Sequence, residues 1–206
     1  MRYYQFPLDE QDPVKVFSHF SEEPFSLFFD SSDPNHELSK CSYICLYPVE
    51  IIESFDRKTV VTNKDQQLSL SGNPFDILKK RMDVWSFCPD DPKQVNGVHR
   101  FRGGVAGYFG YDLGRVLEQI PVRTQRSSDI PDMAVGIYNT VMAFSHTTGK
   151  NILYVMAVNE NEARQKAGEI FDKLKKGQAN YPANDMRDIS PVRLIPVVGE
   201  REFKKD

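Results

Sequence analysis

The chain has 206 residues, of which 40% are hydrophobic, 12% aromatic and 27% charged. These proportions exclude a disordered or collagen-like protein, and the length suits one domain or two small ones. The formal net charge is -3, from 26 basic and 29 acidic residues. Composition therefore gives no basic footprint for nucleic acid and no polybasic stretch for a membrane surface, and neither partner is expected.

Three cysteines, Cys41, Cys45 and Cys88, favour a reducing compartment, because their number is odd and no secretory signal precedes them. We therefore expect a cytoplasmic protein. Cys41 and Cys45 fall four residues apart in an expected strand, so their side chains lie about 13 Å apart, too far for a disulfide. No second Cys/His pair has zinc-ligand spacing. The cysteines are interpreted as buried structural thiols, and no metal site is predicted.

Two helix starts are visible in the first half of the chain. Asp12 should cap a short helix beginning at Pro13, and Asn73 should cap a second one beginning at Pro74. The apolar face expected for the second helix is Phe75, Leu78, Met82 and Trp85. The strands expected around these helices are 2–8, 24–29, 42–53 with a break or bulge at Pro48, 58–62 and 67–70. A polar loop is expected over 30–40, a turn at 63–65 and another loop over 88–96.

The second half gives the clearest signal, a hairpin of two β-rich runs over 133–145 and 151–158. A glycine-rich strand is expected over 102–110, a short helix over 112–119, and a last helix over 159–176 that Gly177 closes. The pattern predicts an α+β fold of mostly antiparallel sheets with three or four flanking helices. We expect one domain over 1–176 and a linker over 177–206.

Five glycines stand within the thirteen positions from Arg102 to Gly114. Such a segment could cradle a phosphate, although it matches neither GxGxxG nor GxxxxGK[ST]. The simpler interpretation is a strand whose glycines allow another backbone or a large side chain to pack closely. Asp112 and Arg115, three residues apart, favour an ion pair over a catalytic role.

No nucleophile, general base or metal-ligand motif can be recognised from residue chemistry alone. The four histidines do not share metal-ligand spacing with another ligand, and no GxSxG or HExxH motif occurs. No catalytic residue is therefore predicted in this chain.

The blocks Gly103–Arg115 and Ile130–Tyr138 resemble the N-terminal region of component I of the chorismate-utilising synthases, which make aminodeoxychorismate or anthranilate. The motif residues are Gly103, Gly104, Gly107, Gly110, Tyr111, Asp112 and Arg115. The Gly-Tyr-Asp-Leu-Gly-Arg form looks more like the aminodeoxychorismate enzymes. Upstream, 28–31 is Phe-Phe-Asp-Ser where the family often has Leu-Leu-Glu-Ser, and the resemblance extends over about residues 3–176.

This resemblance implies the N-terminal part of the anthranilate synthase component I-like fold. In the family, this part packs against a chorismate-binding catalytic domain, which holds the Mg²⁺ carboxylates. No motif of that domain is found here, so no cofactor is expected in this chain and Mg²⁺ is expected only in the catalytic half. The implied partners are the chorismate-binding catalytic domain and a glutamine amidotransferase subunit.

The family also implies a tryptophan pocket, whose matching positions are Asp30, Ser31, Leu38, Ser39 and Lys40. The alternative interpretation of these five residues is a polar surface loop. Three functions follow from the resemblance. The first expectation is that the chain resembles, and would serve as, the non-catalytic N-terminal domain of an aminodeoxychorismate synthase component I, in 4-aminobenzoate and folate synthesis. Alternatively, it is the same domain of an anthranilate synthase, or a stand-alone tryptophan-binding or interaction module.

Overall fold

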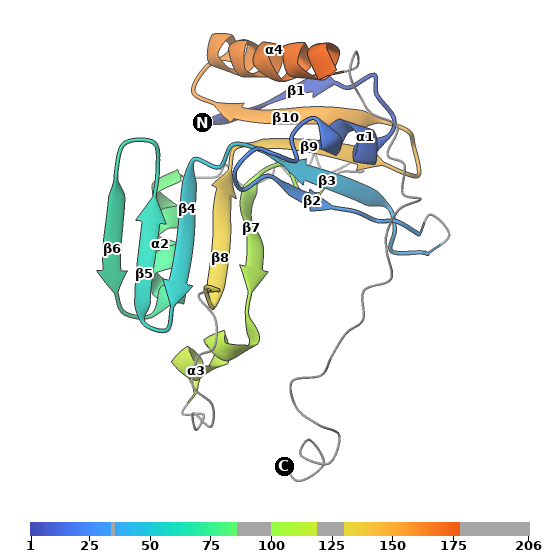
Figure 1. Cartoon of the computed structure of the whole chain (residues 1–206). Helices are drawn as coiled ribbons and strands as arrows, with labels where there is room; N and C mark the ends of the chain where they lie inside the picture. Colours follow the sequence, from blue (N-terminus) through green and yellow to red (C-terminus); the bar gives the residue numbers. More distant parts are fainter. Residues whose placement is uncertain (34–35, 86–99, 119–129, 178–206) are drawn as a thin grey trace.

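The computed structural model describes residues 1–33, 36–85, 100–118 and 130–177, and within them two five-stranded antiparallel sheets are found. The first sheet has the order β1-β10-β9-β3-β2, formed by Arg2–Pro7, Asn151–Ala157, Thr140–Ser145, Cys41–Cys45 and Leu27–Phe29. The second has the order β6-β5-β4-β8-β7, formed by Gln67–Ser71, Lys58–Thr62, Glu50–Phe55, Met133–Tyr138 and Gly104–Phe109. Figure 1 shows their strands running in steeply different directions.

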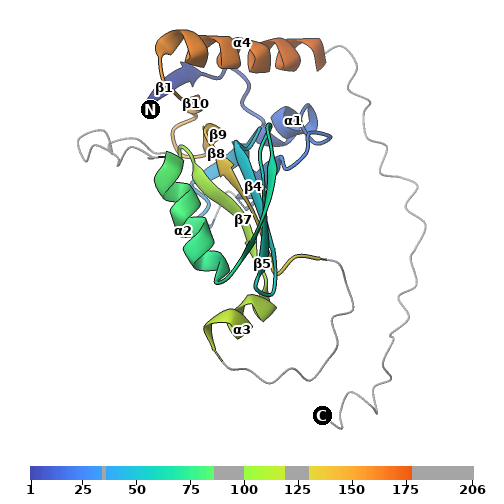
Figure 2. The same ribbon diagram turned by 90° about the vertical axis from the view of Figure 1, so that its left-hand side faces the viewer.

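The helices of the described residues are α1 (Pro13–Ser18), α2 (Pro74–Trp85), α3 (Gly114–Leu117), which follows a short 3₁₀ turn, and α4 (Glu160–Gly177). Helices α1 and α4 pack against the first sheet and α2 against the second, whereas α3 lies beyond the end of β7 (Figure 1). Helix α4 lies along the first sheet and α2 along the second (Figure 2). The predicted α+β class is therefore confirmed. No helix in the described ranges is long and apolar enough to cross a membrane.

Both predicted helix starts are confirmed by their caps. The Asp12 side chain accepts hydrogen bonds from the backbone N–H groups of Val14 and Lys15, at 2.9 and 3.2 Å. The Asn73 side chain accepts one from the Phe75 N–H at 2.9 Å. Such bonds satisfy donors that have no partner within the helix.

The predicted apolar face of α2 is confirmed except at Met82, since Leu78 is buried in the second sheet's cluster and Phe75 and Trp85 pack against it. Pro74, Ile77 and Leu78 are its buried residues, whereas Met82 is 39% exposed. Ile77 joins this face although it was not predicted there.

Two segments expected as single strands are each divided between the sheets. The segment 42–53 is divided between β3, which ends at Cys45, and β4, which begins at Glu50. The segment 133–145 is divided in the same way between β8 and β9. The two crossing segments lie together, since the Leu46 N–H donates to the Thr140 carbonyl at 3.1 Å and the Val49 N–H to the Ile137 carbonyl at 2.8 Å. The break at Pro48 was visible in the sequence, but its consequence, a change of sheet, was not.

Three buried clusters hold the fold together. The first lies between the first sheet and helices α1 and α4, and the second between the second sheet and α2. The third is small and lies where the two sheets meet, with Cys45, Ala106, Tyr138 and Val141 at its centre. Cys45 is thus a buried thiol, as predicted, and burial raises its pKa to about 12. Cys41 is only half-buried, and Cys88 lies outside the described residues.

Candidate functional site

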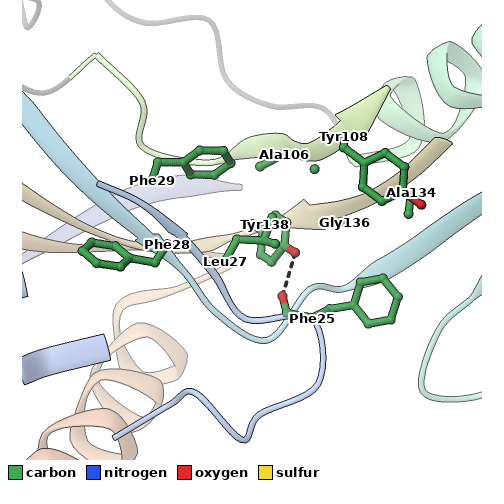
Figure 3. A pocket seen from close by; sticks show the side chains of 10 residues that line it. Phe25, Leu27, Phe28, Phe29, Ala106, Tyr108, Ala134, Gly136 and Tyr138 are labelled. Carbon is green, nitrogen blue, oxygen red and sulfur yellow. Dashed lines mark hydrogen bonds between the residues drawn. The ribbon is translucent and has the colours of Figure 1, made fainter. Parts of the chain in front are cut away.

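An apolar pocket of about 280 Å³ lies between β2, at the edge of the first sheet, and strands β7 and β8 of the second. Its walls include Leu27 and Phe29 from β2, Ala106 and Tyr108 from β7, and Gly136 and Tyr138 from β8. Figure 3 shows these side chains around one space, with the hydroxyl group of Tyr138 directed at the main chain of Phe25. The volume is close to the lower end of the range for small-molecule sites, about 300–1,000 Å³.

The polar atoms of the pocket's tyrosines are already paired with main-chain carbonyls. Tyr138 donates to the Phe25 carbonyl at 2.7 Å, and Tyr108 donates to the Pro131 carbonyl at 2.9 Å. Burial raises the pKa of Tyr138 well above its ordinary value, so its hydroxyl stays protonated and donates. The described lining therefore offers an uncharged, aromatic surface, which suits a flat apolar group.

The glycine-rich segment forms β7, which belongs to the wall of this pocket. A Cβ atom on Gly107 would lie 2.2 Å from the Ala134 carbonyl oxygen, and one on Gly110 would lie 2.8 Å from the Asp132 carbonyl oxygen. These contacts support the interpretation that glycine permits close approach of another backbone. Gly103 and Gly104 precede them with φ values of 152° and 127°, which favour glycine.

The remaining motif residues lie just after β7. Arg115 forms the predicted ion pair with Asp112, with 2.9 Å between nitrogen and oxygen. Tyr111, between Gly110 and Asp112, is 99% exposed. The structure thus places the motif partly at the pocket and partly on the surface.

Asp30 and Ser31 follow β2 directly and form hydrogen bonds with the first residues of β3. The Ser31 hydroxyl donates to the Cys41 carbonyl at 2.8 Å, and its N–H donates to the Ser42 hydroxyl at 3.0 Å. The Asp30 carboxylate accepts from the Ser42 hydroxyl at 3.1 Å. Neither residue lines the apolar pocket, although Phe29 before them does.

The other three predicted tryptophan contacts lie in the loop before β3. Leu38 is 76% exposed, the Ser39 N–H donates to the His36 carbonyl at 2.9 Å, and the Lys40 N–H donates to the Leu38 carbonyl at 2.8 Å. None of the three lines the pocket. Their part in tryptophan binding stays a prediction from the resemblance.

A polar cluster that the sequence did not indicate centres on Ser42. Its hydroxyl group, which is fully buried, also lies 2.8 Å from Nε2 of His146, in the turn between β9 and β10. This cluster contains serine, histidine and aspartate but is not a nucleophilic triad, because Asp30 contacts the serine and not the histidine. It ties the loop after β2 to β3 and to the β9–β10 turn.

An ion pair between β4 and α2 holds a buried carboxylate. Glu50, 1% exposed, accepts from Nε of Arg81 at 2.7 Å and also contacts the second guanidinium nitrogen. In the part of the chain that the structure describes, no three His, Cys, Asp or Glu side chains are grouped so as to hold a metal ion. The Mg²⁺ implied by the resemblance therefore has no fitting ligand set among the described residues.

The sequence profile of the chorismate binding enzymes matches residues 24–206. Aminodeoxychorismate synthase component 1 of Escherichia coli is 28% identical over 149 residues, which cover 72% of this chain and 32% of the relative. Anthranilate synthase component 1 of Acetivibrio thermocellus is 27% identical over 169 residues, or 81% of this chain and 33% of the relative. The chain thus spans about a third of the length of these curated relatives.

The fold has a counterpart among solved structures. Anthranilate synthase component I from Streptococcus pneumoniae aligns with a TM-score of 0.60 over 83% of this chain and 37% of that chain, at 21% sequence identity. The two antiparallel sheets and their helices thus follow a known architecture. Together with the profile match over most of the sequence, this places the chain in the family of chorismate-binding enzymes.

Proposed function

We propose that this chain is the N-terminal part of component I of an aminodeoxychorismate synthase. The complete enzyme would add an amino group to C4 of chorismate, on the route to 4-aminobenzoate and folate. The observation that carries the proposal is the family match over residues 24–206, with an E. coli aminodeoxychorismate synthase among the similar proteins. The Gly-Tyr-Asp-Leu-Gly-Arg motif at 110–115 favours this product by resemblance.

Anthranilate synthase component I is the second candidate. The Acetivibrio thermocellus relative carries that name and matches a larger share of the chain, 81% against 72%. The two relatives are almost equally similar to this chain, at 28% and 27% identity. Which product the complete enzyme makes is therefore a question for an activity assay.

In either enzyme, the described part of this chain would be scaffold rather than catalyst. Since its described residues contain no group that fits a metal ion, the Mg²⁺ of the family is proposed to bind in the chorismate-binding catalytic domain. The proposed partners are that domain and a glutamine amidotransferase subunit that supplies ammonia, in the cytoplasm.

The apolar pocket supports the further proposal that L-tryptophan binds here. Its aromatic walls and its volume of about 280 Å³ suit an indole ring. Asp30, Ser31, Leu38, Ser39 and Lys40 are proposed to meet the polar end of the amino acid. This second part rests on the resemblance and on the position of Asp30 directly after Phe29 in the sequence.

Turnover of chorismate tests the proposed function. We expect no product when the 206-residue chain is mixed with chorismate, ammonia and Mg²⁺. The same assay is then applied to an enzyme that contains this chain together with a chorismate-binding catalytic domain. Formation of aminodeoxychorismate would support the first candidate and formation of anthranilate the second. Turnover by the 206-residue chain itself would contradict the non-catalytic role.

A further inference from the structure

We infer that Tyr138 is a positioning residue that shapes the apolar pocket for a flat aromatic ring, and that Gly136 and Phe25 are its two structural partners. The ligand class rests on the proposed function, because indole is the ring that the proposed tryptophan would place there. The positioning role rests on the geometry of these three residues.

Gly136 leaves the space that the Tyr138 ring occupies. The two residues are neighbours on one face of β8, two positions apart. A Cβ atom on residue 136 would lie 2.5 Å from Cζ and 2.6 Å from Cε2 of Tyr138. Any side chain at 136 must therefore displace the tyrosine ring, and the ring is a wall of the pocket.

The Tyr138 hydroxyl group is bonded to the main chain of Phe25, another residue that lines the pocket. It donates to the Phe25 carbonyl at 2.7 Å, across 113 positions of sequence. Phe25 has a φ of 55°, a left-handed conformation that is uncommon for a residue with a bulky side chain. Such a conformation persists where surrounding contacts fix it, and this hydrogen bond is one that the described structure provides. Figure 3 shows this bond as a dashed line between the Tyr138 hydroxyl and the main chain of Phe25.

The size of the pocket depends on small residues beside these walls. Ala106, 8% exposed, faces the same space from β7 and leaves it open. Tyr138 itself is fully buried. Its position is therefore determined by packing against Gly136 and by the bond to Phe25, and the space left between β2, β7 and β8 follows from that position.

Binding of free indole to the complete 206-residue chain tests this inference. Titration is followed by calorimetry well below the unfolding midpoint of each variant, and L-tryptophan is titrated in parallel. Tyr138→Phe keeps the ring and removes the bond to Phe25, so we expect indole affinity to fall at least fivefold and amide exchange near Phe25 to accelerate. Gly136→Ala should lower the affinity further, more than tenfold, because it displaces the ring.

Tyr43→Phe is the matched control. The Tyr43 hydroxyl accepts from the Arg100 N–H at 3.2 Å, and its ring belongs to the same inter-sheet cluster without lining the pocket. This variant should bind indole within twofold of the unchanged chain. Ala106→Leu places a larger side chain in the pocket and should abolish binding.

Three results would overturn the inference. They are failure of the unchanged chain to bind indole, unchanged affinity and amide exchange in Tyr138→Phe, and an equal loss in Tyr43→Phe. Failure to bind indole would also contradict the proposed tryptophan site, whereas the proposed synthase role is tested separately, by chorismate turnover.

Discussion

Each of the helices α2 and α4 makes an ion pair with a residue outside the helix, but the two pairs differ strongly in their exposure to solvent. Helix α2 is joined to the second sheet through Arg81 and Glu50, and this carboxylate is 1% exposed. Helix α4 is joined to the segment before the first sheet's β2 through Lys173 and Glu23, whose side chains are 37% and 29% exposed. We therefore expect the buried Arg81–Glu50 pair to matter much more for the free energy of unfolding than the partly exposed Lys173–Glu23 pair.

The strands of the two sheets also differ in how deeply their side chains are buried. All six residues of β9, in the middle of the first sheet, are buried. On β7, at the edge of the second, Tyr108 and Phe109 are 43% and 51% exposed. The middle of the first sheet is covered by its apolar cluster with α1 and α4, and the candidate site lies where its edge strand β2 meets β7 and β8 of the second sheet.

The largest effect should come from Arg81→Met. This change leaves the Glu50 carboxylate buried without its partner, and we expect the free energy of unfolding to fall by about 3–5 kcal/mol. Urea denaturation followed by circular dichroism measures the loss.

The double variant Glu50→Gln, Arg81→Met separates charge from packing. It removes the uncompensated charge and should recover much of the stability. If Arg81→Met alone lowered the free energy of unfolding by less than about 1 kcal/mol, the buried pair would stabilise the fold no more than an exposed pair does. The expected difference between the two ion pairs would then be wrong.

Gly107→Ala should destabilise the second sheet next most strongly. Its φ is 152° and the new Cβ would meet the Ala134 carbonyl oxygen at 2.2 Å, so strain and overlap together should cost about 2–3 kcal/mol. Gly72→Ala is the control, because Gly72 also has a positive φ, 135°, but no atom lies within 4 Å of the new Cβ. Thermal unfolding of both variants measures the difference, and equal losses would show that close strand approach contributes nothing at Gly107.

The single strands and helices were easier to predict than the way the strands are divided between the two sheets, for identifiable reasons. The run over 151–158 and the apolar positions of 159–176 have clear periods, and both elements were found where expected. At Asn139 the chain passes from one sheet to the other without any glycine or proline, so the sequence carried no signal for the change. The pocket depends on how β2, β7 and β8 come together, and such long-range pairing leaves no local pattern.

The site residues were predictable only in part. The glycines of β7 were correctly interpreted as points of close packing, because glycine within a strand is unusual in itself. Tyr138 was visible only as one residue of an apolar strand. Its hydrogen bond to Phe25 joins positions 113 residues apart, which spacing rules cannot anticipate.

The inter-sheet cluster should make stability depend on alkaline pH. Burial raises the pKa of Cys45 from its ordinary value of 9.0 to about 12. Between these values the unfolded chain releases a proton that the folded chain keeps, so the free energy of unfolding should decrease as pH rises from 9 toward 12. At pH 10, ionisation of Cys45 in the unfolded chain should lower the free energy of unfolding by about 1 kcal/mol.

Urea midpoints measured from pH 7 to 10.5 check this dependence. Cys45→Ala should show a smaller decrease above pH 9 than the unchanged chain, whatever its stability at pH 7. Equal slopes for the two proteins would show that the Cys45 thiol ionises as easily in the folded chain as in the unfolded one.

The smallest effect is expected from Lys173→Met, on the first sheet. The lysine contacts the Glu23 carboxylate, and its Nζ lies 5.2 Å from the centre of the Phe20 ring. Because both charged groups are partly exposed, solvent screens their attraction, and the loss should be only about 0.5–1 kcal/mol. Glu23→Gln, which keeps the ring contact, should cost less, and 1 M salt should narrow the difference between Glu23→Gln and the unchanged chain. A loss as large as that of Arg81→Met would mean that α4 depends on its ion pair as strongly as α2 does, against the difference in their burial.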